Sequence, residues 1–151
     1  MESIFDKIDL QSLLPLVIAL ALGTVIGIER EVNKKPAGLR TNALICMGAA
    51  AFIVIAQRIG LNLDAISRMT AGIVTGVGFI GGGAVLRDHE NISGVTTAAT
   101  IWVVTSIGIA CGMHFYDIAI GITIFSLVVL TIFSPIDKKI RQTKDTKSHH
   151  Q

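Results

Sequence analysis

The stretch Met69–Leu86, MTAGIVTGVGFIGGGAVL, decides the fold of this chain. It carries no charge, yet six of its residues are glycine. In water each glycine would cost a helix interior roughly 1 kcal/mol relative to alanine. In a bilayer only helices and closed barrels satisfy the backbone, and glycine lets a second helix approach closely. We therefore expect a membrane helix that packs against protein, and we place it at the centre of a small bundle.

One side of this helix consists mainly of small side chains. At 100° per residue, several of them share an arc of about 100°, and Gly78 and Gly82 lie beside it. We call this arc the small-residue face; it comprises Arg68, Gly72, Thr75, Gly76, Phe79 and Gly83. Elsewhere in the chain, Gly23–Gly27 and Gly108–Gly112 have the GxxxG spacing that favours close helix packing. Together these glycine faces favour a homodimer.

The composition is that of a membrane protein. Of the 151 residues, 51% are hydrophobic and only 16% are charged, which is below the usual quarter for soluble domains. The mean hydropathy is +0.65. A net charge of +2 without interleaved aromatic and basic residues argues against a nucleic-acid partner. The expected surroundings are therefore the lipid bilayer.

Apolar runs predict five transmembrane helices and an all-α bundle. The runs are 10–28, 41–59, 69–86, 95–113 and 118–133, the last ended by Ser134-Pro135. We expect one transmembrane domain over residues 1–134 and a basic, solvated tail over residues 135–151. Counting Lys and Arg gives ten on the side of the first loop, third loop and tail, against three on the other side. The N-terminus is thus predicted outside and the C-terminus in the cytoplasm.

Polar residues gather at the predicted cytoplasmic ends of the spans. Helix N-termini attract anions, and two spans begin on that side. We predict a polar cup lined by Glu29, Arg30, Arg40, Thr41, Arg87, Asp88, Ser93, Thr96 and Thr97, able to bind an anion or a partner. The alternative is that the arginines set the topology and the hydroxyl groups cap helices.

Other constellations give weaker signals. The carboxylates Glu29, Glu31, Asp88 and Glu90 could bind Mg²⁺, but arginines lie among them. Asp64 and Arg68, four residues apart, predict an ion pair at the outer face. Cys46 and Cys111 are expected about 20 Å apart in depth, too far for a disulfide. We expect no metal site, no cofactor and no enzymatic activity, because no nucleophile–base pairing stands out.

Four segments resemble the MgtC/SapB family of small bacterial inner-membrane proteins. They are GTVIGIERE (23–31), KPAGLRTNALICMGAA (35–50), GIVTGVGFIGGGAVLR (72–87) and GVTTAATIWVVTSIGIACG (94–112). The resemblance implies a five-span domain whose motif residues include Glu29, Arg30, Gly38, Arg40, Thr41, Gly78, Thr96 and Thr97. The founding members carry a soluble C-terminal domain, whereas here a basic tail follows Pro135, as in the shorter, SapB-like members.

The resemblance implies a role in adaptation to low Mg²⁺. We expect a non-enzymatic, multi-pass protein of the bacterial cytoplasmic (inner) membrane that modulates other membrane proteins. The alternative is a transporter or channel for Mg²⁺ or another small ion.

Overall fold

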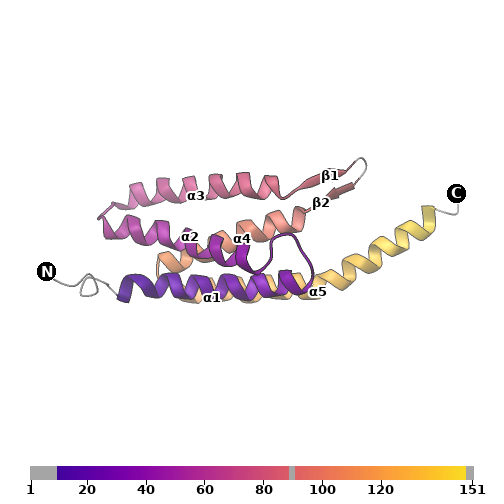
Figure 1. The fold of residues 1–151 in the computed structure, drawn as a ribbon, viewed down its shortest axis with the longest axis horizontal. Coiled ribbons are helices and arrows are strands. Elements are labelled where there is room, and N and C mark those ends of the chain that lie inside the picture. The colour runs from indigo at the N-terminus through magenta and orange to yellow at the C-terminus, as the bar shows by residue number, and fades with distance from the viewer. Residues whose placement is uncertain (1–9, 89–90, 149–151) are drawn as a thin grey trace.

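Five helices run back and forth along one axis, so that the first and last described residues lie at opposite ends (Figure 1). The computed structural model describes the backbone of residues 10–88 and 91–148 and the side chains of residues 10–85 and 93–133. The helices are α1 (Leu10–Val32), α2 (Leu39–Arg58), α3 (Leu63–Gly83), α4 (Val95–Gly112) and α5 (Tyr116–Ser148). All five are long and apolar enough to cross a membrane, which confirms the predicted fold class.

The segment between α3 and α4 forms a short hairpin that the sequence did not predict. Strands β1 (Leu86–Asp88) and β2 (Asn91–Ser93) pair in antiparallel register, with Leu86 opposite Ser93. Gly94 then opens α4 in a left-handed conformation, with φ of 85°. A Cβ at Gly94 would collide with the Ala84 carbonyl oxygen. Glycine is therefore required there for both backbone conformation and space.

Several helix ends differ from the sequence expectation. Helix α1 continues to Val32, so Glu29 and Arg30 belong to its last turns and not to a loop. Helix α3 starts earlier, at Leu63, because the Asn62 side chain accepts a hydrogen bond from Ala65 N at 2.9 Å and caps it. Helix α5 does not end at Ser134-Pro135 but continues to Ser148. Proline removes one N–H from the ladder, and a helix in or near a membrane can tolerate that loss.

The central helix is α4, and the expectation that α3 lies at the centre is wrong. Helix α4 contacts all four other helices, whereas α3 packs mainly against α4 and, less closely, against α2. Of the most apolar eighteen-residue window of each helix, 56% is buried in α4 and only 6% in α3. In Figure 1, α3 runs along one edge of the bundle.

The close helix contacts lie instead at the GxxxG pairs of α1 and α4. A Cβ at Gly23 would lie 2.6 Å from Cys46 Cβ, and one at Gly27 would lie 2.6 Å from Leu39 Cα. A Cβ at Gly112 would lie 2.7 Å from Ile53 Cβ. Both α1 and α4 thus approach the α2 backbone through glycine, as expected for helices packed in lipid.

The two cysteines share one buried cluster, so the expected depth separation is wrong. A Cβ at Gly108 would collide with the Cys46 carbonyl oxygen. Cys111 lies three residues, or about 4.5 Å along the axis, beyond Gly108. Both thiols are free and fully buried. The depth estimate failed because it took α2 and α4 to start at the same level, whereas α4 is shifted along its axis relative to α2.

Alanine at Gly108 should destabilise the bundle, whereas alanine at Gly72 should not. The first Cβ meets the α2 backbone, and overpacking of this kind costs about 1–3 kcal/mol. The second meets nothing within 4 Å, and alanine has the higher helix propensity. Thermal unfolding in detergent, followed with a thiol-reactive dye on buried Cys46 and Cys111, measures both. Equal midpoints for the two variants would contradict this assignment of the packing contacts.

Candidate functional site

A buried charge marks one end of the bundle, where α1 and α3 end and α2 and α4 begin. Arg30, in the last turns of α1, is only 3% exposed. Its Nη2 donates a hydrogen bond to Thr97 Oγ1 of α4 at 3.4 Å. Such a buried cation inside a membrane bundle is costly unless it is paired, and it marks a candidate functional site.

Glu29 supplies the opposite charge. Its side chain is 8% exposed, and its Oε2 lies 3.6 Å from Arg30 Nη1. The other oxygen, Oε1, accepts a hydrogen bond from Asn33 Nδ2 at 2.8 Å. The pair is electrically neutral as a unit, which makes its burial tolerable.

Asn42 of α2 adds a fully buried amide to the same end of the bundle. Its Nδ2 donates to the carbonyl oxygens of Ala37 and Gly38 at 2.7 and 2.8 Å, which fixes the turn before α2. At this end of the bundle, three buried side-chain atoms have no hydrogen-bond partner among the described residues: Arg30 Nε, Glu29 Oε2 and Asn42 Oδ1. We call Glu29, Arg30, Asn42 and Thr97 the Arg30 cluster. It can both donate and accept hydrogen bonds within the protein interior.

Glu31 caps the start of α2 from the preceding helix. Its Oε2 accepts a hydrogen bond from Leu39 N at 3.1 Å. Gly38, the N-cap residue, offers no side chain for this purpose. A carboxylate at a helix N-terminus satisfies a free N–H and interacts favourably with the helix dipole. A Cβ at Gly38 would collide with this carboxylate, so glycine leaves the space that the cap needs.

The structure brings together only part of the predicted polar cup. Glu29, Arg30 and Thr97 meet as described above. The side chains of Arg40, Thr41, Ser93 and Thr96 are exposed, and none of them hydrogen-bonds to the Arg30 cluster. The side chains of Arg87 and Asp88 lie outside the described residues. Binding of an anion or a partner at the cup therefore remains a prediction.

The structure also tests the predicted Asp64–Arg68 ion pair and the alternative set of Mg²⁺ ligands. No ion pair joins Asp64 and Arg68, whose side chains are both exposed at the start of α3. Exposed pairs of this kind contribute little, about 0–1 kcal/mol, so neither side chain is held in place. Of the alternative Mg²⁺ ligands, Glu29 and Glu31 are engaged by Asn33 and Leu39, while the other two side chains lie outside the described residues. Within the described residues, no group of three or more His, Cys, Asp or Glu could hold a metal ion.

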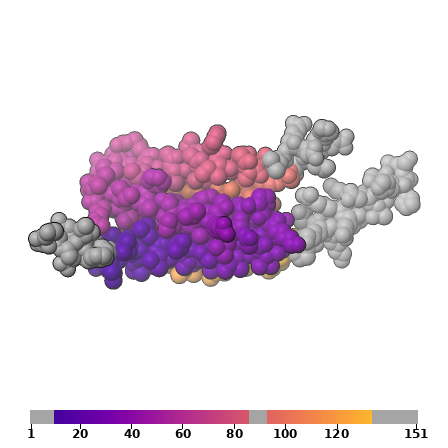
Figure 2. Space-filling view, in the orientation of Figure 1, coloured from indigo at the N-terminus to yellow at the C-terminus, as the bar shows by residue number. Residues whose placement is uncertain are grey.

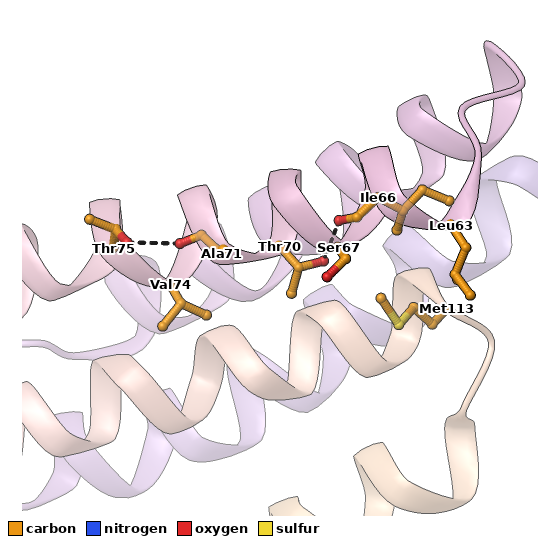
Figure 3. A pocket seen from close by; sticks show the side chains of 8 residues that line it. All are labelled: Leu63, Ile66, Ser67, Thr70, Ala71, Val74, Thr75 and Met113. Carbon is orange, nitrogen blue, oxygen red and sulfur yellow. Dashed lines mark hydrogen bonds between the residues drawn. The ribbon is translucent and has the colours of Figure 1, made fainter.

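Two open grooves flank α3. The first lies between α2 and α3, has a volume of about 650 Å³ and is lined by apolar and glycine residues, including Phe52, Gly72 and Gly76. In the space-filling view, the orange surface of α4 shows between these two helices (Figure 2). The second, of about 550 Å³, is lined by α3 residues and Met113. There the hydroxyl groups of Thr70 and Thr75 bond back to carbonyl oxygens of their own helix at 2.8 Å (Figure 3).

Sequence reasoning missed Asn42 at this end of the bundle, and it considered Glu31 only as a possible Mg²⁺ ligand and not as a helix cap. Asn42 is a polar residue inside an apolar run, a signal that by itself indicates an intramembrane site. Glu31 gave no comparable signal, because its role depends on where the chain returns after α1. Gly81, buried against Ala98 of α4 at 3.6 Å, was also left out of the expected packing glycines.

Comparison with known proteins gives consistent results. The sequence model of the MgtC family matches residues 16–139. The protein named "Protein MgtC" of Salmonella typhimurium LT2 is 38% identical over 130 residues, covering 86% of this chain and 55% of the relative. "Putative magnesium transporter YhiD" of Escherichia coli K12 is 44% identical over 126 residues, covering 78% of this chain and 58% of the relative. No solved structure matches.

Replacement of Arg30 by methionine should destabilise the fold more than loss of the Thr97 hydroxyl. Arg30→Met leaves the buried Glu29 carboxylate unpaired, at about 3–5 kcal/mol. Thr97→Val removes one long hydrogen bond, at about 1 kcal/mol. The double variant Glu29→Gln/Arg30→Met should recover part of the loss, because no unpaired charge remains. Dye labelling of the buried thiols during heating measures all three, and equal effects of both single variants would contradict the pairing.

The cap at α2 predicts a coupled pair of substitutions. Gly38→Ala should destabilise the protein, because the new Cβ displaces the Glu31 carboxylate from Leu39 N. In a Glu31→Ala background the same change should cost less, since the carboxylate is already absent. A double-mutant cycle on thermal unfolding checks this expectation, and strictly additive effects would show that the two residues do not interact.

Proposed function

Because this chain belongs to the MgtC family, we propose that it is a bacterial inner-membrane protein with a non-enzymatic, Mg²⁺-linked role exerted through contacts with other membrane proteins. The name of the Escherichia coli relative, "Putative magnesium transporter YhiD", supports the link to Mg²⁺. The chain spans just over half the length of these relatives, namely 55% and 58%. The Mg²⁺ link is accordingly proposed for the membrane domain that the two share with this chain.

One observation carries the contact-based role: α3 is a membrane-length helix that a single chain leaves almost uncovered. Only 6% of its most apolar window is buried, and glycines 72, 76, 78, 82 and 83 have no neighbour within 4 Å of an added Cβ. Lipid tails gain little from glycine, whereas a second helix can approach it closely. A helix of this composition is therefore suited to bind protein within the membrane.

The second candidate function is transport of Mg²⁺, which is favoured by the name of the Escherichia coli relative. At that end of the bundle the buried carboxylate of Glu29 is paired with Arg30, so it offers no uncompensated negative charge to bind a cation. The α2–α3 groove offers apolar and glycine side chains instead of the oxygen ligands that Mg²⁺ prefers. We therefore rank the contact-based role first.

Two measurements separate the candidates. Purified protein in liposomes loaded with a Mg²⁺-sensitive dye should give no Mg²⁺ influx above that of protein-free vesicles.

A photo-crosslinking amino acid in place of Phe79, which is 87% exposed on α3, should capture protein in native membranes. The same amino acid at Phe125, 72% exposed on α5, is the matched control and should capture far less. Saturable, protein-dependent Mg²⁺ influx, together with equal capture at both positions, would overturn the proposal in favour of transport.

A further inference from the structure

The α2–α3 groove is apolar along its whole length. Its lining residues come from 45–52 of α2 and 69–80 of α3, and none of them is charged. Gly48 on one wall and Gly72 and Gly76 on the other have nothing within 4 Å of an added Cβ. Apolar space of this kind does not hold water, because water finds no polar partner in it. Within a bilayer the groove is therefore filled by lipid or by protein.

The dimensions of the groove decide which of these fits. Residues 69–80 rise by about 16 Å along α3, close to the depth of one leaflet of the hydrocarbon core, about 15 Å. A volume of about 650 Å³ over that length gives a mean cross-section of about 40 Å². A helix is about 10 Å across and occupies about 80 Å², so it is too wide to enter. An extended acyl chain is narrower than a helix and matches the groove in length and polarity.

A cation stands at one end of the groove. Gly72, Gly76 and Ile80 line it at intervals of four residues. Arg68 is the next position of this series toward the start of α3, where it lies about 7.5 Å inside the helix. Its side chain is exposed and forms no ion pair with Asp64 or with any other described residue. An unpaired guanidinium inside a membrane-length helix is costly unless an anion reaches it.

The phosphodiester of a phospholipid supplies an anion at this depth. Side chains on a helix lean toward its N-terminus, so Arg68 leans from the groove toward the membrane surface at the start of α3. A guanidinium binds phosphate oxygens through two charge-assisted hydrogen bonds. A phospholipid with its phosphate at Arg68 has an acyl chain directly below, along the groove. Charge at one end and an apolar channel of leaflet length thus favour a lipid over a protein segment.

We propose that the α2–α3 groove binds an acyl chain of an anionic phospholipid whose phosphate pairs with Arg68. The bound chain fills the space between α3 and α2 and gives α3 a second packing surface besides α4. This inference goes beyond the proposed function and does not depend on it. Phe79, Gly82 and Gly83 lie outside the groove lining and stay open to a protein partner.

Quenching of tryptophan fluorescence by phospholipids with brominated acyl chains measures this binding in liposomes. Trp102, the single tryptophan, is replaced by phenylalanine, and Phe52→Trp places a new one in the groove. The control is Phe125→Trp on α5, which is also exposed and lies outside the groove. In phosphatidylcholine vesicles, brominated phosphatidylglycerol should quench the groove tryptophan at a severalfold lower mole fraction than the α5 tryptophan.

Two variants of the protein with the groove tryptophan test the stated contacts. Arg68→Gln should remove the preference for phosphatidylglycerol, because the phosphate loses its cation. Gly76→Leu should also remove it by filling the groove. Gly121→Leu is the matched control, since this α5 glycine likewise has nothing within 4 Å of an added Cβ, and it should leave the preference unchanged. Protection of buried Cys46 from a thiol-reactive dye reports that each variant keeps its fold.

The outcomes decide for or against the bound lipid. A severalfold preference at the groove that Arg68→Gln and Gly76→Leu both remove supports it. Equal quenching curves for the two tryptophans overturn it, as does a preference that persists in either variant. A groove tryptophan that brominated lipid does not quench shows that protein covers the groove, which also overturns it. Capture of protein at Phe79 is measured separately, so the proposed function stands or falls independently of these results.

Discussion

Contact of helix backbones at glycine is the constraint on which the bundle depends. Within lipid there is no hydrophobic force that drives helices together, so association relies on close packing over many atoms. Here α1 and α4 both place GxxxG pairs against α2, at Cys46, Leu39 and Ile53. The α1–α2–α4 unit is thereby fixed at short range. The longer apolar side chains on the outside of the bundle, such as Phe52 and Phe125, are left to the lipid.

This tight unit explains how the Arg30 cluster can exist. Gly27 brings the end of α1 onto Leu39 at the start of α2, and the side chains of Glu29 and Arg30 that follow are buried. There Arg30 finds Glu29 and Thr97, while Glu31 reaches Leu39 N. Three helices thus meet through polar contacts at one end of the bundle and through glycine contacts along their length. Polar contacts of this kind specify which helices neighbour one another as well as stabilising them.

Hydropathy predicted the five spans and the fold class, because a bilayer requires long apolar helices. The glycine pattern predicted which faces are small, but periodicity within one helix does not say what covers that face. For Gly23 and Gly108 the partner is α2, whereas Gly72 and Gly76 are open in the single chain. Asn42 donates hydrogen bonds to the carbonyl oxygens of Ala37 and Gly38. These bonds depend on the conformation of the turn before α2, which the hydropathy pattern does not specify. Pro135 was predicted to end the last helix, as proline usually does in water-soluble proteins, whereas α5 continues through it.

The close contact between Ala84 and Gly94 forms the base of the hairpin between α3 and α4. Gly94 lies directly against the Ala84 carbonyl, so the end of α3 and the start of α4 are held together before the strands begin. The distance between the two helices is therefore independent of the number of hairpin residues between Ala84 and Gly94. The segment beyond Ala84 and Gly94 is therefore a position where an epitope or reporter can be inserted without moving either helix.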